Sequence, residues 1–229
     1  GLASVNGSIF PEPASRVVVM SYDYAVLAGT QGQQNHRKKD RLFDVAERLH
    51  TPVILVAEGG GGRPGDTDGL GVSGLDCWAF HDFARLSGLV PLVGITGGFC
   101  FAGNAALLGC CDVVIAITGS NIGMGGPAMI EGGGLGSFRP TEIGPLEVQR
   151  ANGVVDIVAK DDADAVRLAR QYLGYFQGSL TNSGAPDQTR LRDIVPLNRV
   201  KAYDVRTVLD VLFDIDSVLE LRTGFGTGV

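Results

Sequence analysis

The chain lacks the features that membrane-inserted and nucleic-acid-binding proteins need. No apolar run approaches the ~18 residues of a membrane-spanning helix, and no signal-peptide pattern is found. The formal net charge of −6 disfavours a nucleic-acid surface and leaves only local basic clusters to bind anions. We therefore expect no membrane or nucleic-acid partner, and a location in the cytoplasm, or in the mitochondrial matrix if the organism is a eukaryote.

Cysteines are few and are poorly placed for metal or disulfide chemistry. The four are Cys77, Cys100, Cys110 and Cys111, and none forms a C-x2-C pair. The adjacent thiols of Cys110 and Cys111 suit neither a zinc site nor a disulfide. We expect buried or half-buried thiols in a reducing compartment, and no metal in this domain.

Aromatic residues are also scarce, at 7% of a chain in which 45% of residues are hydrophobic, which indicates a core of aliphatic and small side chains. The 34 glycines fall in clusters between periodic segments, as is typical of loops and close backbone approaches. A length of 229 residues suits one large α/β domain, or one domain and part of another. Because the sequence starts without Met and stops in a glycine-rich stretch, we expect a fragment of a longer protein.

Apolar strands alternate with short helices between residues 52 and 117, a pattern typical of α/β proteins with a parallel sheet. An amphipathic helix is predicted earlier, over residues 33–49, with Leu42, Val45, Ala46 and Leu49 on its buried face. No internal repeat is visible. The other predicted elements are strands at 16–20, 24–28, 52–57, 89–95, 113–117 and 154–158 and helices at 75–86, from 102, from 161 and at 205–213.

The stretch from Val93 to Asp112 carries the clearest chemical signal. It is an apolar strand, a turn of small residues and a short helix that opens at Ala102-Gly103. The first helical turn exposes backbone N–H groups without an intrahelical partner, at the positive end of the helix dipole. Gly103 has no side chain to block a ligand. We expect this turn to hold an acyl thioester carbonyl while an enolate forms.

A second group of backbone donors is predicted in the glycine run after the strand at 52–57. The run formally contains G-x-G-x-x-G at Gly60, Gly62 and Gly65, but Pro64 falls where a dinucleotide-binding helix would begin. The alternative is that the Gly61 and Gly62 amides point at a ligand. Because neighbouring parallel strands end at one edge of a sheet, these amides and those of Ala102-Gly103 are expected to converge as an oxyanion hole.

No side chain is poised as a nucleophile or base. Ser73 lies in Gly71-Val72-Ser73-Gly74, which is not the G-x-S-x-G elbow of serine hydrolases. Asp66 and Asp68 lie in a polar loop and are expected to cap or solvate it. The basic run His36-Arg37-Lys38-Lys39, with Arg41 one turn on, is either a solvated helix face or a phosphate-binding patch.

The motifs together resemble a known family. Ala102 to Asp112 resembles the helix-opening signature of the crotonase superfamily, in which a glycine nine residues before the closing aspartate supplies an oxyanion-hole amide; here that glycine is Gly103. Within that superfamily the chain is more similar to the carboxyltransferase subunit of biotin-dependent acyl-CoA carboxylases. The supporting runs are Glu58-Gly59-Gly60-Gly61-Gly62-Arg63 (Asp-Ser-Gly-Gly-Ala-Arg in the family), Val154-Val155-Asp156, Asp161 to Ala165, Ile194-Val195-Pro196-Leu197 and Lys201-Ala202-Tyr203-Asp204-Val205.

The resemblance implies an architecture. The fold would be α/β, a crotonase/ClpP-like spiral of repeated ββα units. Residues 1–178 would form the N-terminal, acyl-CoA-binding carboxyltransferase domain, 179–193 a linker and 194–229 the beginning of a truncated C-terminal carboxyltransferase domain. The active site would form between protomers of a homo-oligomer.

The resemblance also implies a function, that of a ligase of fatty acid metabolism that transfers the carboxyl group of carboxybiotin to the α-carbon of an acyl-CoA. Backbone amides of Gly61, Gly62, Ala102 and Gly103 would hold the thioester. Biotin, carried on another domain or subunit, would itself act as the base, and a biotin carboxyl carrier and a biotin carboxylase would be partners. Lys38 and Arg41 match basic positions of the family, so that they, with the neighbouring Arg37 and Lys39, are candidates for binding the CoA phosphates.

Departures from the family pattern leave the acyl chain and two other functions open. Glu58 to Gly62 replaces Asp-Ser-Gly-Gly-Ala, and Ala102-Gly103 replaces Gly-Gly, although both changes keep the backbone donors. One alternative is a crotonase-type enoyl-CoA hydratase or isomerase, which would need Glu131 or Glu142 to fold back to the site. The other is a non-catalytic assembly domain, which would leave the donor turns without a use. Alone, the chain is not expected to turn over.

Overall fold

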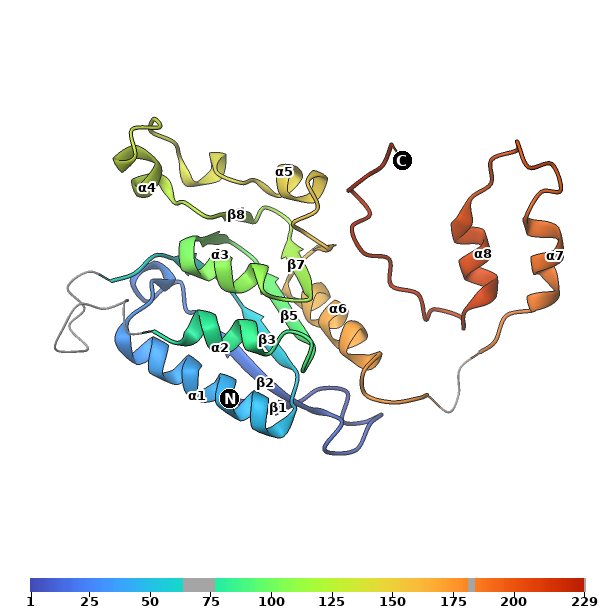
Figure 1. Ribbon diagram of the computed structural model, residues 1–229, viewed down its shortest axis with the longest axis horizontal. Coiled ribbons are helices and arrows are strands. Elements are labelled where there is room, and N and C mark those ends of the chain that lie inside the picture. Colours follow the sequence, from blue (N-terminus) through green and yellow to red (C-terminus); the bar gives the residue numbers. More distant parts are fainter. Residues whose placement is uncertain (64–76, 181–183, 229) are drawn as a thin grey trace. The chain divides into compact units, whose positions relative to one another are not determined.

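The computed structural model describes residues 1–63, 77–180 and 184–228. The chain divides into two units, Gly1–Gln177 together with Leu221–Val229, and Gly178–Glu220. The first unit contains two sheets, whose strand orders are β1-β2-β3-β5-β7-β9 and β4-β6-β8 (Figure 1). Among the described residues, no helix is long and apolar enough to cross a membrane.

The larger sheet is parallel except at its first strand. β1 (Leu2–Ser4) pairs antiparallel with β2 (Arg16–Ser21). The strands that follow, β3 (Val53–Val56), β5 (Leu92–Thr96), β7 (Val113–Ile117) and β9 (Ile157–Ala159), are parallel to β2. The central strands β3, β5 and β7 are apolar and buried on both faces, as the continuous apolar runs predict.

The smaller sheet extends three strands of the larger one. β4 (Gly59–Gly60), β6 (Phe99–Phe101) and β8 (Asn121–Gly123) follow β3, β5 and β7 directly in the chain. Each of these strand pairs leads into a helix: α2 (Ala79–Arg85), α3 (Ala102–Gly109) and α4 (Pro127–Gly132). The predicted repetition of ββα units is therefore confirmed, although the sequence itself shows no repeat.

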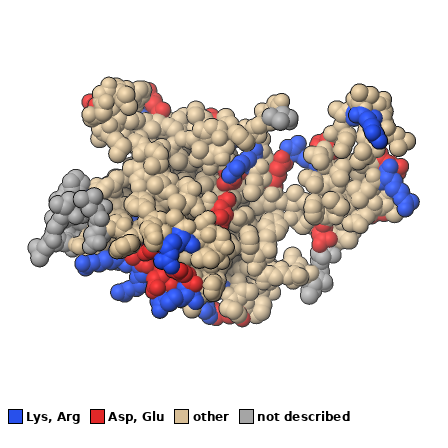
Figure 2. Space-filling model, in the orientation of Figure 1, with Lys and Arg blue, Asp and Glu red and all other residues tan. Residues whose placement is uncertain are grey.

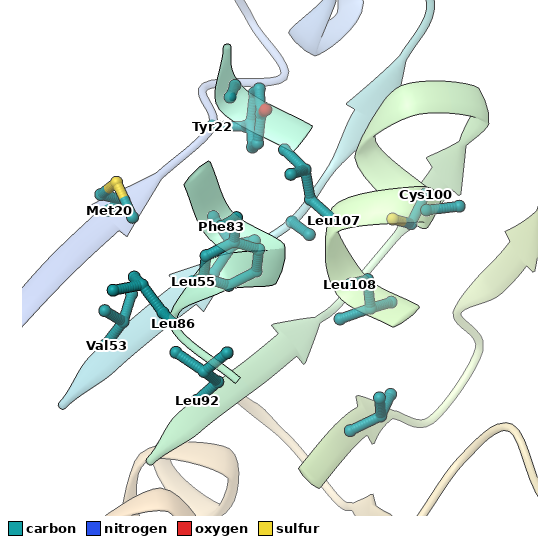
Figure 3. Close-up of a cluster of buried hydrophobic side chains, with 14 of the residues drawn as sticks. Met20, Tyr22, Val53, Leu55, Phe83, Leu86, Leu92, Cys100, Leu107 and Leu108 are labelled. Carbon is teal, nitrogen blue, oxygen red and sulfur yellow. The ribbon is translucent and has the colours of Figure 1, made fainter. Parts of the chain in front are cut away.

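Helices cover both faces of the larger sheet. On one face, α1 (Gln33–Leu49), α2 and α3 pack on alternate strand residues, so that Val53 and Leu55 meet Phe83, Leu107 and other apolar side chains in the main core (Figures 1 and 3). On the other, α6 (Asp162–Gly174) contacts β7 and β9. The remaining elements are the 3-10 turns η1 (Leu27–Gly29) and η2 (Pro140–Glu142) and the helix α5 (Leu146–Ala151).

The second unit is short, and its regular elements are helical. It contains η3 (Gln188–Arg190), α7 (Leu191–Ile194) and α8 (Val205–Leu212), which contact one another. Asp204 caps α8 by accepting the N–H of Arg206, whose guanidinium binds both carboxylate oxygens of Glu220. The predicted assignment of residues 194–229 to a second carboxyltransferase domain, with a linker at 179–193, stays a prediction.

Three predictions of local structure are wrong. Residues 24–28 are a turn running into η1, because Leu27 and Ala28 adopt left-handed backbone angles (φ 48° and 56°) that a strand does not allow. The strand predicted at 154–158 begins only at Ile157. The third is Leu49 of α1, which is exposed, whereas Ala46 of the same predicted face is buried and Leu42 and Val45 pack against the core. His36, Lys39 and Phe43 are also buried on this helix.

Candidate functional site

The structure places the two predicted donor segments side by side. In the smaller sheet Gly60 of β4 is the register partner of Phe101 of β6. The residues that follow this pair are Gly61-Gly62 on one strand and Ala102-Gly103 on the other. Because β4 and β6 are parallel, both segments leave the sheet in the same direction, at the carboxyl ends of β3 and β5. The four residues thus share one edge of the fold.

The first turn of α3 is not capped by a side chain of the described residues. Its N-cap residue, Phe101, is extended (φ −125°, ψ 160°), and no side chain of that residue caps the helix. Ala102 has a left-handed φ of 51°, a conformation that is unfavourable for a residue with a Cβ. No acidic side chain lies in the first turn. The N–H groups there have no intrahelical acceptor and carry the positive end of the helix dipole.

Space differs between the two donor segments. A Cβ at Gly103 would lie 2.8 Å from Gln31 Nε2 and 3.0 Å from Phe80 Cζ, so α3 begins in close contact with its neighbours. Among the described residues, a Cβ at Gly61 or Gly62 would meet no atom within 4 Å, and Gly61 has a φ of 86° that favours glycine. The described part of the chain therefore leaves space beside the Gly61-Gly62 segment.

A buried group of polar side chains connects these segments; we call Gln31, Lys39 and Asn104 the amide clamp. Lys39 Nζ donates to Gln31 Oε1 (2.8 Å), and Gln31 Nε2 donates to Asn104 Oδ1 (2.5 Å). Asn104 Nδ2 donates to the carbonyl oxygens of Gly29 (3.0 Å) and Glu58 (2.6 Å). The three residues are between 0% and 5% exposed. The side-chain oxygen and the side-chain nitrogen of Gln31 and of Asn104 therefore each have a hydrogen-bond partner.

The predicted basic cluster is divided by the structure. Lys39 points inward, where Nζ also donates to the hydroxyl of Tyr22 (2.8 Å), and burial lowers the pKa of Lys39 to about 8. Arg37, Lys38 and Arg41 are exposed on α1. Their spacing of three and four residues places them on one side of the helix. Lys39 is thus separated from the exposed three.

Charge is distributed unevenly along α1 (Figure 2). Towards its C-terminal end, Arg48 pairs with Asp44 (2.6 Å), and Glu47 pairs with Arg85 of α2. In the part of the chain that the structure describes, Arg37, Lys38 and Arg41 form no ion pair. These three cations are therefore available to an anionic ligand.

His36 and Cys77 form a further contact near the clamp. Cys77 Sγ lies 2.8 Å from His36 Nδ1. Burial and the nearby Lys39 ammonium lower the pKa of His36 to about 4, and burial raises the pKa of the Cys77 thiol. The pair is consequently a neutral thiol and a neutral imidazole near pH 7, which is not the thiolate–imidazolium pair of a cysteine nucleophile.

Within the described part of the chain, the glutamates required by the hydratase alternative form no hydrogen bond or ion pair with the donor segments. Glu131 is exposed on α4. The carboxylate of Glu142 accepts the backbone N–H of Arg139 (2.7 Å) and also a hydrogen bond from the Arg139 guanidinium (3.2 Å). The carboxylate of Glu58 accepts the N–H of Gly97 (3.2 Å). Other sequence candidates, namely Pro64, Gly65, Asp66, Asp68, Ser73 and the predicted helix start at 75, lie outside the described residues.

Sequence reasoning missed Gln31 and Asn104. Neither residue carries a sequence motif of its own, since Asn104 lies within the stretch from Val93 to Asp112 and Gln31 lies outside every predicted element. A signal did exist for Lys39, because His36, Lys39, Phe43 and Ala46 recur at intervals of three and four residues, the period of one helix face. Two of those four are apolar, which marks the face as buried.

Comparison with known proteins identifies the family. The carboxyl transferase domain family matches residues 14–229. The chain is 28% identical, over all of its length and 44% of the relative's, to the methylmalonyl-CoA carboxyltransferase 12S subunit of Propionibacterium freudenreichii subsp. shermanii. The crystal structure of a transcarboxylase 12S hexamer with hydrolysed methylmalonyl-CoA bound superposes with a TM-score of 0.76 at 27% identity, covering 91% of this chain and 42% of that one.

A larger protein is more similar still. The structure of a single-chain, multi-domain long-chain acyl-CoA carboxylase matches all of this chain and 22% of its own, with a TM-score of 0.93 and 58% identity. The crotonase-like fold predicted from the sequence is confirmed by these neighbours. The chain spans less than half the length of the 12S relative and about a fifth of the long-chain enzyme.

Proposed function

Because the chain belongs to the carboxyl transferase domain family, we propose that it is the acyl-CoA-binding part of a biotin-dependent acyl-CoA carboxylase. Within that enzyme it would take part in moving a carboxyl group from carboxybiotin to the α-carbon of an acyl-CoA. The observation that carries the proposal is the register pair Gly60–Phe101, which brings two loops of backbone donors together.

In the proposed site, amides of Gly61-Gly62 and Ala102-Gly103 donate to the thioester oxygen. That oxygen gains negative charge when the α-proton leaves, and donors aimed at it stabilise the enolate more than the ground state. A single such donor lowers the activation barrier of acyl transfer by about 3–4 kcal/mol. Backbone amides alone are therefore adequate for this step, with the base supplied by biotin on another domain or subunit.

The CoA phosphates are proposed to bind Arg37, Lys38 and Arg41. These cations are exposed, lie on one side of α1 and form no ion pair within the described residues. Lys39 is not proposed to bind the CoA phosphates, since its ammonium is buried against Tyr22 and Gln31.

The rest of the enzyme is proposed by analogy with the relatives. A biotin carboxyl carrier and a biotin carboxylase would be partners, on the same or on other chains, and the active site would form between protomers of a homo-oligomer. The hexamer of the transcarboxylase 12S structure supports the oligomer. A compartment that is cytoplasmic, or the mitochondrial matrix of a eukaryote, stays a prediction.

The first test uses the intact enzyme that contains this chain. We expect it to carboxylate an acyl-CoA only when biotin is present, and isothermal calorimetry to detect binding of the acyl-CoA to the enzyme. Hydration of an enoyl-CoA without biotin would favour the hydratase alternative. Absence of binding at millimolar acyl-CoA would contradict both and favour an assembly domain.

The second test concerns the phosphate-binding cations. The double variant Lys38→Glu/Arg41→Glu is expected to weaken CoA binding at least tenfold at low salt, with a smaller difference at high salt because ions screen exposed charges. Arg48→Glu is the matched control on the same helix, since Arg48 already pairs with Asp44. Equal affinity in the double variant and the control would remove Lys38 and Arg41 from the site.

A further inference from the structure

We propose that Gln31 is a positioning residue: with Lys39 and Asn104 it fixes the Gly61-Gly62 segment relative to the first turn of α3, so that amides from both act on one thioester oxygen. This inference rests on the proposed function and names the side chains that hold its oxyanion hole together. Gln31 belongs to neither donor segment.

Gln31 is bonded to both donor segments at once. Its backbone N–H donates to the carbonyl oxygen of Gly61 (2.8 Å), and Gln31 and Gly62 form an isolated parallel bridge. Its side-chain amide donates to Asn104, the residue after Gly103 (2.5 Å). One buried residue, 4% exposed, therefore spans the gap between the two halves of the site.

The direction of the hydrogen bonds in the clamp is fixed by its two ends. The Lys39 ammonium can only donate, so the oxygen of Gln31 must face it and the Gln31 nitrogen must face Asn104. At the other end, carbonyl oxygens can only accept, so the nitrogen of Asn104 faces Gly29 and Glu58. Turning either amide over would place like groups against each other. A single arrangement satisfies all of these atoms.

Among the described residues, the strand pairing that joins the two segments is short. β4 has only two residues, both glycine, and its ladder to β6 ends at the Gly60–Phe101 pair. Beyond that pair, Gly61-Gly62 and the first turn of α3 are no longer joined by ladder hydrogen bonds of β4 and β6. A displacement of 1 Å at a reacting centre costs roughly 100-fold in rate, so a link across this point acts on the transition state more than on substrate binding.

The test is the isosteric variant Gln31→Glu in the intact enzyme. The carboxylate can keep its contact with Lys39 but sets an oxygen against Asn104 Oδ1 in place of the donor. We expect kcat to fall about 100-fold while KM and the calorimetric Kd for acyl-CoA change less than about threefold. That pattern distinguishes positioning from loss of substrate affinity.

Gln177→Glu is the matched control. Gln177 is also buried, at 8% exposed, and its Nε2 donates to the carbonyl oxygens of Val5 (2.9 Å) and Ala14 (3.1 Å). The same replacement there removes the donor to two partly buried carbonyls without touching the clamp. We expect a similar or larger fall in Tm and a kcat within about twofold of wild type. If Gln31→Glu lowered kcat no more than this control, the inference would be overturned.

A second variant covers the case in which Gln31→Glu fails to fold. Lys39→Met keeps the aliphatic stem and removes the ammonium that orients Gln31, and we expect kcat to fall about tenfold with KM for acyl-CoA maintained. Wild-type kcat in Lys39→Met would contradict the clamp. If the wild-type enzyme itself transferred no carboxyl group to any acyl-CoA, the proposed function would fail before the clamp is tested.

Discussion

The two ends of the parallel strands carry different polar groups. At the amino ends, carboxylates take up backbone donors: Asp112 accepts the N–H of Leu92 and Asp156 that of Val114, each at 2.8 Å. At the carboxyl ends, the side-chain amide of Asn104 donates to backbone carbonyl oxygens instead. The carboxylate at that end, Glu58, binds the β5–β6 turn and not the start of α3.

The difference indicates where a ligand oxygen can bind. Aspartates at one end occupy N–H groups that would otherwise be free for a ligand. Amides at the other end occupy carbonyl oxygens, and α3 has no acidic side chain of its own in its first turn to occupy the N–H groups there. A developing oxyanion requires just such an arrangement of donors in place of acceptors.

The largest effect is expected at the carboxyl end. Gly103→Val places a side chain against Gln31 and Phe80, which displaces the amide of residue 103, and we expect kcat of the intact enzyme to fall about 100- to 1,000-fold. Gly109→Val is the control, because a Cβ at that end of the same helix meets no atom of the described residues within 4 Å. Steady-state kinetics with acyl-CoA measures both. Retained activity in Gly103→Val would exclude that amide from the site.

At the amino end a variant is expected to affect stability and spare catalysis. Asp156→Ala leaves the buried N–H of Val114 without its acceptor and removes the partner of Arg222, at an expected cost of about 2–3 kcal/mol in the free energy of unfolding. Urea denaturation measures this loss, and kcat per folded molecule should match wild type. A lowered kcat in a fully folded variant would break the contrast between the two ends.

The buried Lys39 makes the free energy of unfolding depend on pH. Burial lowers the pKa of Lys39 from 10.5 to about 8, so between these values the unfolded chain holds a proton that the folded one has lost. The free energy of unfolding then rises with pH across that window. Relative to Lys39→Met, wild type should gain on the order of 1–2 kcal/mol from pH 8 to pH 10.

Urea titrations of both proteins at each pH measure that gain. The groups facing Lys39, namely Tyr22, Cys77 and Asp40, are present in both proteins, so their contributions largely cancel. A difference that stays constant from pH 8 to pH 10 would show that Lys39 keeps its ordinary pKa.

The smallest effect is expected at Ala102. Its left-handed φ of 51° costs about 1–2 kcal/mol relative to glycine, and glycine's greater freedom in the unfolded chain offsets part of this. Ala102→Gly should therefore raise the free energy of unfolding by roughly 0.5 kcal/mol, measured in urea. A loss of stability would mean that the methyl group of Ala102 packs favourably enough to outweigh its backbone conformation.

Much of the architecture could be read from local patterns. The helix at 33–49 and the strand at 113–117 match α1 and β7, because a 3.6-residue period and a continuous apolar run are strong signals. The strands β4, β6 and β8 were missed, since two or three residues with several glycines carry no strand pattern. Residues 24–28 were misread for the opposite reason, as an apolar run whose backbone turns.

The candidate site was predicted in the same partial way. Gly61, Gly62, Ala102 and Gly103 were proposed from sequence, because the ends of neighbouring parallel strands must meet at one edge. Gln31 could not be proposed from the sequence, since its role depends on a hydrogen bond to Asn104, 73 residues away. Lys39 was placed among surface cations because residue type alone predicts exposure for lysine.

The sequence by itself determined the alternation of strands and helices, the family signature and the placement of glycine where backbone must come close. Those features depend on residues near one another in the chain. Only the tertiary structure decided which polar side chains join the two donor segments and which cation on α1 is buried. Hydrogen bonds between distant segments form after the strands are in register, and a short-range pattern carries no information about that register.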